Sequence, residues 1–200
     1  MIFTIGKFLN SIKKPMIDQL LELDKQLLLV INGIGNEYWD YFWYFITNKQ
    51  SFFPLYAILI YLMCKNKTKR SILLLLFIIS LMITFTDQVT NLFKDGFERL
   101  RPCADKSISG LLRLENCHGF GFFSGHSSNS MAAAVFTILM LKSKLPKYIF
   151  LMIPWSLAVG FSRIYIGKHY PFDVICGWTF GFFSGYLFYF FYKKISNKYI

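Results

Sequence analysis

The stretch SILLLLFIISLMITFTDQVTNLF, residues 71–93, decides the fold. It is long enough for a helix that crosses a bilayer, which needs about twenty predominantly apolar residues. Over the whole chain of 200 residues, 54% of the side chains are hydrophobic and 20% are aromatic. A soluble protein of this length would expose more apolar surface than a monomer tolerates. The stretch and the composition together predict an integral membrane protein.

Further apolar segments are expected to cross the membrane beside the first, namely 51–64, 127–141, 147–162 and 172–192. Several are shorter than about twenty residues, so their helices are expected to extend into the flanking loops. The predicted fold class is therefore all-α, a polytopic bundle of transmembrane helices. The transmembrane domain is predicted to cover residues 51–200.

The N-terminal part of the chain, residues 1–50, mixes acidic and polar residues with apolar and aromatic ones. This mixture favours amphipathic helices that lie in the membrane interface, and residues 1–50 are predicted to be such an interfacial region. A sixth span around residues 25–47 is the alternative. The bundle is thus expected to have five or six spans.

Short basic loops separate the apolar segments: KNKTKR (65–70), KSKLPK (142–147) and KKISNK (193–198). Because basic loops stay in the cytoplasm, the other loops, 94–126 and 163–171, should face the extracytoplasmic side. The net charge is +11, but its placement in these gaps favours contact with anionic lipid over nucleic acid. The expected location is the bacterial inner membrane.

Three glycines in the last apolar segment, Gly177, Gly181 and Gly185, recur at four-residue spacing. They would lie on one face of a helix and allow another helix to approach closely. The ordinary enrichment of glycine in membrane helices is an equally good explanation.

The two extracytoplasmic loops hold three cations that do not titrate near neutral pH, Lys94, Arg101 and Arg163. Guanidinium and ammonium groups together form a strong clamp for an oxyanion such as phosphate. Ser124 and Gly125 lie where the segment 127–141 begins, and a helix N-terminus also favours an anion. Phosphate is therefore the expected ligand.

Two histidines in the same loops could divide the chemistry, because one can attack phosphorus while the other protonates the leaving oxygen. Asp173 follows His169 by four residues, and a carboxylate at that distance can bond one ring nitrogen and stabilise the imidazolium. His169 is thus the predicted nucleophile and His126 the predicted general acid.

The joint spacing of KDGFERLRP (94–102), FSGH (123–126) and SRIYIGKHYPFD (162–173) resembles the three-part signature of the type 2 phosphatidic acid phosphatases, the lipid phosphate phosphatases. The family pattern is Lys, six residues, Arg-Pro; then Pro-Ser-Gly-His; then Ser-Arg, five residues, His, three residues, Asp. This chain departs from it at Phe123, where the family usually has proline.

The resemblance implies a membrane enzyme that hydrolyses a terminal phosphate from a lipid phosphate or diphosphate through a phosphohistidine intermediate. It implies that the phosphate is bound by the three cations, Ser124 and the amides of Gly125 and His126. It also implies that no metal ion or other cofactor takes part. Such a terminal phosphate occurs on undecaprenyl diphosphate, phosphatidylglycerol phosphate, phosphatidate and lipid A. We favour undecaprenyl diphosphate as the substrate, or an enzyme of broad specificity.

Two other classes of function remain open from the sequence. A lipid phosphotransferase would use the same phosphohistidine but pass the phosphate to another lipid. A non-catalytic lipid-binding membrane protein would use neither histidine. The complete set of catalytic residue types argues against the non-catalytic protein and leaves the phosphotransferase open.

Asp87 lies inside the segment 71–93, where a carboxylate is costly and often functional. Asp87, Asn91 and Lys94 share one helix face, so Asp87 is predicted to hold Lys94 or a neighbouring arginine in place. An aspartate already at the wet end of the helix is the alternative.

Four cysteines occur in the chain, and two of them, Cys103 and Cys117, lie in the loop that carries Arg101 and Ser124. An extracytoplasmic loop is oxidising enough for a disulfide between them. Closing a loop of this size stabilises a protein by about 3 kcal/mol in the chain-entropy model. Cys64 and Cys176 are expected to be buried small hydrophobes.

Overall fold

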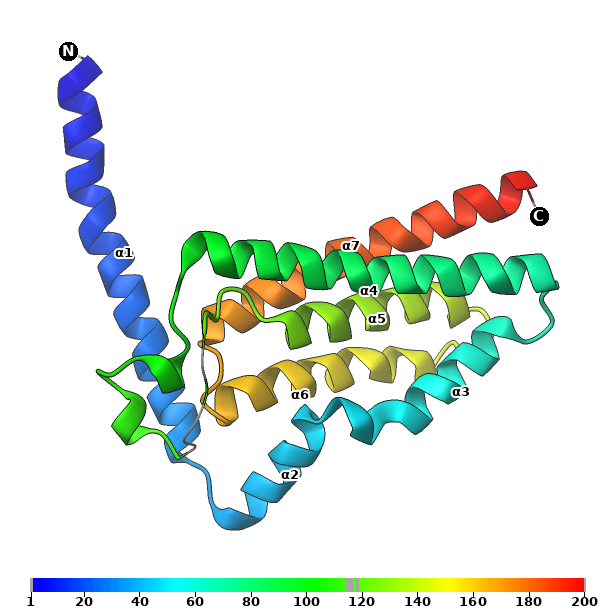
Figure 1. Cartoon of the computed structure of the whole chain (residues 1–200), viewed down its shortest axis with the longest axis horizontal. Coiled ribbons are helices and arrows are strands. Elements are labelled where there is room, and N and C mark those ends of the chain that lie inside the picture. The colour runs from blue at the N-terminus through cyan, green and yellow to red at the C-terminus, as the bar shows by residue number, and fades with distance from the viewer. Residues whose placement is uncertain (1, 114–116, 118, 200) are drawn as a thin grey trace.

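The computed structural model describes residues 2–113, 117 and 119–199, and Figure 1 shows their arrangement. These residues form helices joined by loops, with one isolated antiparallel bridge between Leu100 and Phe120. The α-helices of this part of the chain are α1 (Ile2–Gly33), α2 (Glu37–Thr47), α3 (Phe53–Cys64), α4 (Lys69–Phe97), α5 (Gly125–Leu141), α6 (Met152–Tyr165) and α7 (Pro171–Tyr199). Short 3-10 helices are η1 (Lys49–Phe52), η2 (Pro102–Ala104), η3 (Ser109–Leu111) and η4 (Tyr148–Leu151). The predicted all-α class is confirmed.

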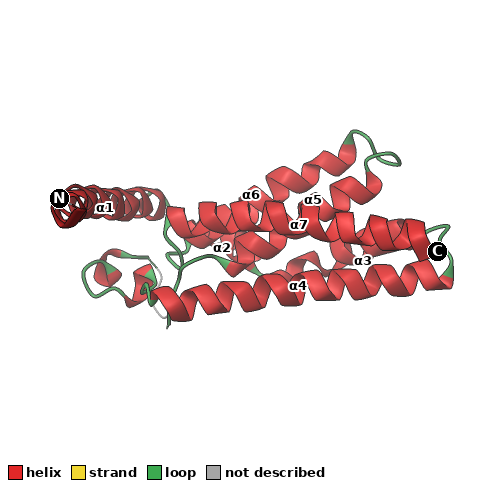
Figure 2. Ribbon diagram, turned by 90° about the horizontal axis from the view of Figure 1, so that it is seen from above, coloured by secondary structure: helices red, strands yellow, loops and turns green. Residues whose placement is uncertain are grey.

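Helices α3 to α7 form a bundle whose members lie side by side in both ribbon views (Figure 1; Figure 2). α5 is the central helix and packs against each of α3, α4, α6 and α7. Its residues are buried on several sides; Ala134 and Phe136, for example, are at most 1% exposed. A helix that is apolar all round suits the middle of a bundle. α5 therefore fixes the positions of the helices around it.

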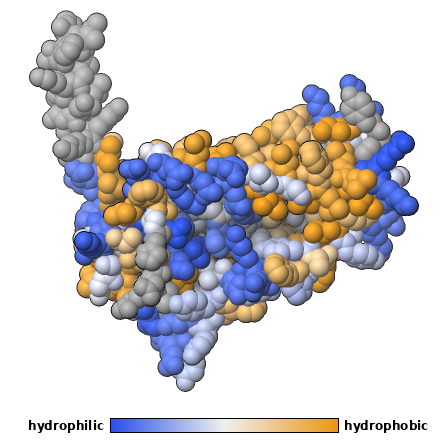
Figure 3. All heavy atoms as spheres, in the orientation of Figure 1, coloured by the Kyte–Doolittle hydropathy of each residue, from blue (hydrophilic) through white to orange (hydrophobic). Residues whose placement is uncertain are grey.

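Three of the described helices are long and apolar enough to cross a membrane: Lys69–Phe97, Tyr148–Tyr165 and Pro171–Lys198. The predicted spans 51–64 and 127–141 correspond to α3 and α5, whose 12 and 17 residues are fewer than a bilayer crossing usually needs. Figure 3 shows apolar residues over the bundle, with polar residues gathered toward both of its ends. The transmembrane bundle is confirmed, and the count of five spans stays a prediction.

The N-terminal region begins with the long helix α1, which projects from one end of the bundle (Figure 1). Its C-terminal part is held in place, since Leu28 is fully buried in a core cluster with Ile164 and Val174. α1 ends at Gly33, and Asn36 caps α2 by accepting a hydrogen bond from Trp39 N at 3.1 Å. Residues 25–47 therefore do not form the one continuous helix that a sixth span would require. The interfacial location of α1 and α2 stays a prediction.

The glycines of α7 lie against the backbone of α5, as the four-residue spacing predicts. A Cβ atom added at Gly177 would stand 2.6 Å from Ser124 O, and one at Gly185 would stand 2.5 Å from Ala132 O. At Gly181 the added atom would collide with Ser128 O. The close approach matters for the site, because it fixes the start of α7 beside the start of α5.

A single added methyl group tests this contact. We expect Gly181→Ala to lower the free energy of unfolding by about 1–3 kcal/mol, since the nearest atom belongs to the backbone of Ser128 and cannot turn aside. Gly96→Ala in α4 is the matched control, because nothing lies within 4 Å of its added Cβ and alanine favours a helix. Thermal unfolding in detergent measures both. An equal melting temperature for the two variants would contradict the prediction.

Candidate active site

The candidate site lies at the end of the bundle where α4 and α6 end and α5 and α7 begin (Figure 1). The loops 94–126 and 163–171 therefore meet there, as the topology predicts. Ser124 N donates a hydrogen bond to Asp173 O at 2.9 Å, which ties the start of α5 to the start of α7. His169 N donates to Arg163 O at 3.2 Å, which folds the second loop back onto the end of α6.

Ser124 is the N-cap of α5 and is fully buried. Its side chain accepts hydrogen bonds from Ser127 N at 3.4 Å and from Ser127 Oγ at 2.9 Å. Phe123, which stands where the family pattern has proline, is buried against Phe93 and Phe180. An aromatic contact thus holds the segment that enters α5. The amides of the first turn, which a helix leaves without internal partners, point out of this N-terminus.

Lys94 reaches this N-terminus from the end of α4. Its Nζ lies 3.8 Å from the place that a Cβ of residue 125 would occupy, so the ammonium stands beside the first turn of α5. Nζ also donates to Asn91 Oδ1 at 3.2 Å. Lys94, Arg101 and Arg163 are close enough to repel one another electrostatically. The structure therefore brings the three predicted cations together.

The two arginines are partly or wholly buried. Arg101 Nε donates to Phe120 O at 3.1 Å, and burial lowers the pKa of this guanidinium while Asp173 raises it. Arg163 is 6% exposed, and its Nη1 donates to Thr47 Oγ1 at 2.7 Å. Its Nε is buried and donates to none of the described residues. Because a buried donor without a partner is costly, this nitrogen is well placed to bind an anion.

His169 and Asp173 form a buried pair in which Nδ1 lies 3.5 Å from Oδ2. His169 is 2% exposed and Asp173 is fully buried. Burial lowers the pKa of His169 to about 4, although the carboxylate of Asp173 acts in the opposite direction. The imidazole is therefore neutral near pH 7, as a nucleophile must be.

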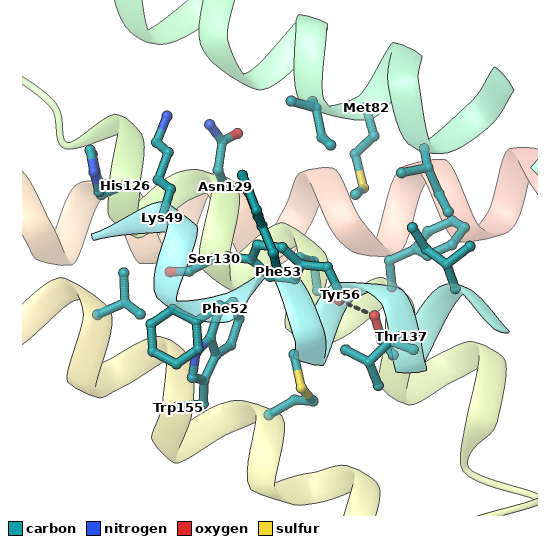
Figure 4. Close-up of a pocket in the computed structure, with 18 of the residues that line it drawn as sticks. Lys49, Phe52, Phe53, Tyr56, Met82, His126, Asn129, Ser130, Thr137 and Trp155 are labelled. Atoms are coloured by element: carbon teal, nitrogen blue, oxygen red, sulfur yellow. Dashed lines mark hydrogen bonds between the residues drawn. The ribbon is translucent and has the colours of Figure 1, made fainter. Parts of the chain in front are cut away.

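His126 lies in the first turn of α5 and lines a cavity of about 370 Å³. In Figure 4, His126, Lys49 and Asn129 gather at one end of this cavity. The rest of its wall is largely apolar and comes from α3, α4, α5 and α6, with Phe53, Met82, Phe136, Trp155 and Val159 among the lining residues. His126 is thus placed between the cation cluster and an apolar space.

Asp87 has a different partner from the one predicted. Its Oδ1 accepts a hydrogen bond from Asn129 Nδ2 at 2.6 Å, and Asn129 Oδ1 in turn accepts from Thr86 Oγ1. None of the ion pairs among the described residues joins Asp87 to Lys94, although the carboxylate acts electrostatically on the ammonium. The carboxylate therefore links α4 to α5, and its predicted role in holding a cation remains a prediction.

Residues that the sequence did not single out also contribute to the site. Arg99 forms ion pairs with Asp173 and with Asp24 of α1, and Thr47 and Lys49 stand next to Arg163 and His126. Arg99 had a signal, since it lies within the motif KDGFERLRP. Asp24, Thr47 and Lys49 had none, because they come from segments far away in sequence.

Cys103 and Cys117 form a disulfide, as predicted, and their Cα atoms are 5.6 Å apart. The bond closes the loop that follows Arg101. Cys64 and Cys176 are free and partly buried.

In the part of the chain that the structure describes, no group of three or more His, Cys, Asp or Glu side chains could hold a metal ion.

Comparison with known proteins places this geometry among relatives. The family model described as the PAP2 superfamily matches residues 71–196. A lipid A 4'-phosphatase of Bacteroides thetaiotaomicron is 38% identical over 188 residues, which cover 92% of this chain and 83% of that protein. A lipid A 4'-phosphatase of Porphyromonas gingivalis is 29% identical over 190 residues, which cover 92% of this chain and 78% of that protein.

A solved structure shares the fold. It is a transmembrane PAP2-type phosphatidylglycerolphosphate phosphatase from Bacillus subtilis, which superposes with a TM-score of 0.71 at 24% identity. The alignment covers 88% of each chain. At this identity the likeness concerns the arrangement of the helices.

Proposed function

The chain belongs to the PAP2 superfamily and is a bacterial membrane lipid phosphatase, and we propose that it works through a phosphohistidine on His169. One observation supports this mechanism most directly. The neutral, buried His169 and its partner Asp173 lie at the end of the bundle that also holds Lys94, Arg101 and Arg163. A nucleophile and an anion-binding cluster are thereby adjacent.

The substrate phosphate would bind within the cation cluster. The Nε of Arg163, which has no partner among the described residues, and the ammonium of Lys94 would each donate to a phosphate oxygen, together with the amides of Gly125 and His126. Charge on the transferring phosphoryl group spreads over its equatorial oxygens in the transition state. Donors that are already in place stabilise this charge without reorganising.

The first step would form one bond and break one bond. Nε2 of His169 attacks phosphorus, and the bond between phosphorus and the lipid oxygen breaks. Asp173 faces Nδ1 and stabilises the positive ring that results. Burial and the neighbouring cations lower the pKa of His126 while no anion is bound, so His126 would take up a proton when the phosphate offsets those charges. It would then give this proton to the departing lipid oxygen.

The second step would reverse the role of His126. The neutral imidazole takes a proton from a water molecule, whose oxygen attacks phosphorus. The nitrogen–phosphorus bond breaks, which releases phosphate and restores neutral His169. His126 is again protonated and ready for the next substrate.

The cavity behind His126 suits the apolar part of a lipid. Its volume of about 370 Å³ and its apolar wall could take a hydrocarbon chain while the head group stays at the polar end (Figure 4). The departing oxygen would then lie next to His126. This arrangement favours a lipid phosphate over a soluble phosphate ester.

The substrate that we propose is lipid A with a phosphate at its 4' position. The proposal relies on the relatives named above, which align over 92% of this chain. Undecaprenyl diphosphate, favoured by the sequence alone, is the second candidate because it presents the same terminal group. The basic loops further support a site on the periplasmic side of the membrane.

A substrate panel with purified protein in detergent and a metal chelator tests the proposal. We expect kcat/KM for lipid A to exceed that for undecaprenyl diphosphate, phosphatidylglycerol phosphate and phosphatidate by about tenfold or more. Mass spectrometry should locate the loss at the 4' phosphate, and the chelator should not change the rate. His169→Gln protein is the control for contaminating phosphatases. Preference for another lipid would reassign the substrate, and no release from any of them would overturn the phosphatase.

Phosphotransfer to a second lipid is the alternative fate of the same intermediate. Labelled substrate distinguishes the two outcomes, since hydrolysis yields inorganic phosphate and transfer yields a labelled lipid. The proposal expects inorganic phosphate as the main product when acceptor lipids are also present.

A further inference from the structure

Arg99 joins two buried carboxylates that lie far apart in the sequence. Its Nη1 donates to Asp173 Oδ1 at 2.7 Å, and its Nη2 donates to Asp24 Oδ2 at 2.6 Å. Asp24 and Asp173 are both fully buried, whereas the Arg99 side chain is 20% exposed. The guanidinium plane also lies over the ring of Tyr170, with Cζ 4.1 Å from the ring centroid. The fork of an arginine is suited to two such acceptors, and the point charge of a lysine is not.

Every partner of the Asp173 carboxylate helps to orient it. Oδ1 is occupied by Arg99, while Oδ2 accepts from Tyr170 N at 3.0 Å and faces His169 Nδ1. Tyr170 immediately precedes α7, so Asp173 also caps this helix from its first turn. With Oδ1 held by Arg99, the oxygen that remains near the imidazole is Oδ2.

Asp24 connects this arrangement to α1. Its Oδ2 accepts the hydrogen bond from Arg99 Nη2, and its Oδ1 accepts one at 2.9 Å from Phe172 N in the first turn of α7. Around it, Leu28 of α1 is packed with Ile108, Ile164 and Val174 in one core cluster. The C-terminal part of α1 is therefore anchored directly beside the residue that supports His169.

We propose that Arg99 is a positioning residue for phosphoryl transfer, which holds Asp173 against His169, and that Asp24 makes α1 a part of the catalytic site. The inference rests on the proposed function of His169 as the nucleophile. Arg99 would act through Asp173, because each of its terminal nitrogens donates to a buried carboxylate. Residues 1–50, predicted as an interfacial region, would then also serve the chemistry.

The main test uses Arg99→Lys, which keeps the charge but cannot bond both carboxylates at once, and Asp24→Asn, which keeps an acceptor for Phe172 N. We expect both to lower kcat, Arg99→Lys by about 10- to 100-fold, with KM changed by less than about twofold. Formation of the phosphoenzyme in a rapid-quench experiment should slow by the same factor. Melting temperatures report whether each variant is folded.

Arg113→Gln is the matched control. Arg113 lies in the same loop as Arg99 and pairs with a carboxylate of the N-terminal region, Asp40, but it contacts neither Asp173 nor His169. We expect its kcat to stay within about threefold of wild type even if its melting temperature falls. If weaker contact between this loop and the N-terminal region were enough to lower kcat, Arg113→Gln would also show the loss.

A double-mutant cycle separates positioning from a general structural effect. In an Asp173→Asn background, adding Arg99→Lys should cost less than about threefold further in kcat, because the group that Arg99 positions has already been changed. Fully additive losses would overturn the inference, as would a raised KM with an unchanged kcat. A fully active Arg99→Lys protein would also overturn it. An active His169→Gln protein would instead refute the proposed mechanism itself.

Discussion

His169→Gln is expected to lower kcat by about 10³-fold or more, because removing a nucleophile forfeits the covalent route and not only one contact. Glutamine keeps a polar group of similar size in a site that is 2% exposed, so the variant should fold. KM should change little, since the cations and the amides of α5 would still bind the phosphate. The measurements are steady-state kinetics with the lipid substrate and trapping of labelled phosphoenzyme, which should be absent.

His126→Ala provides the control that distinguishes the two histidines. A general acid matters most for a poor leaving group, so an activated phenyl ester of phosphate should restore the first step in His126→Ala protein. Phosphoenzyme should then accumulate, because the base for the second step is missing. The same ester should not rescue His169→Gln. If the activated ester restored the first step in His169→Gln but not in His126→Ala, His126 would be the nucleophile and His169 the general acid.

The pH dependence of the first step provides a further check on His169. Burial lowers the pKa of its imidazole to about 4, whereas an exposed histidine titrates near 6.5. The neutral form therefore persists as the pH falls from 7 to 5, and the nucleophile is lost only below about pH 4. Phosphoenzyme formation in a rapid quench should still be observed at pH 5. Its disappearance with a midpoint near 6.5 would mean that the imidazole is exposed.

The long apolar segments made the helices of the bundle predictable. Residues 71–93 fall within α4, and the glycines of the last segment do face another helix, because both features are encoded by local periodicity. The disulfide between Cys103 and Cys117 was predictable for a similar reason, since the loop predicted to face the oxidising side contains two cysteines. Local patterns thus account for most of the fold.

Contacts between distant segments were not predictable in this way. Asp24 and Arg99 are 75 residues apart, and no period or spacing connects a carboxylate in α1 with a guanidinium beyond α4. The partner of Asp87 illustrates the same limit. The sequence predicted that Asp87 shares a helix face with Lys94, but the hydrogen bond of Asp87 goes to Asn129 across the bundle. Side chains choose such partners only after the helices have docked.

Arg163→Lys is expected to lower kcat/KM by about 10²- to 10³-fold, although it preserves the positive charge. Arg163 donates to Thr47 through Nη1, and its buried Nε donates to nothing in the described part of the chain, so one planar group spans a protein anchor and the proposed phosphate site. The ammonium of lysine is a point charge and cannot do both at once. Steady-state kinetics with the lipid substrate should show a raised KM together with a lowered kcat.

Lys168→Gln and Thr47→Val show which property of Arg163 is responsible. Lys168 interacts electrostatically with Arg163 and Arg101. Lys168→Gln therefore removes one nearby positive charge and leaves the Arg163 guanidinium intact. We expect Lys168→Gln to lower kcat/KM by less than about threefold. Thr47→Val should cause an intermediate loss of kcat/KM, because the Arg163 guanidinium then lacks its hydrogen bond to Thr47 but keeps its planar set of donors. If Lys168→Gln were as damaging as Arg163→Lys, the site would depend on its total positive charge. The directed donors of Arg163 would then not be what binds the phosphate.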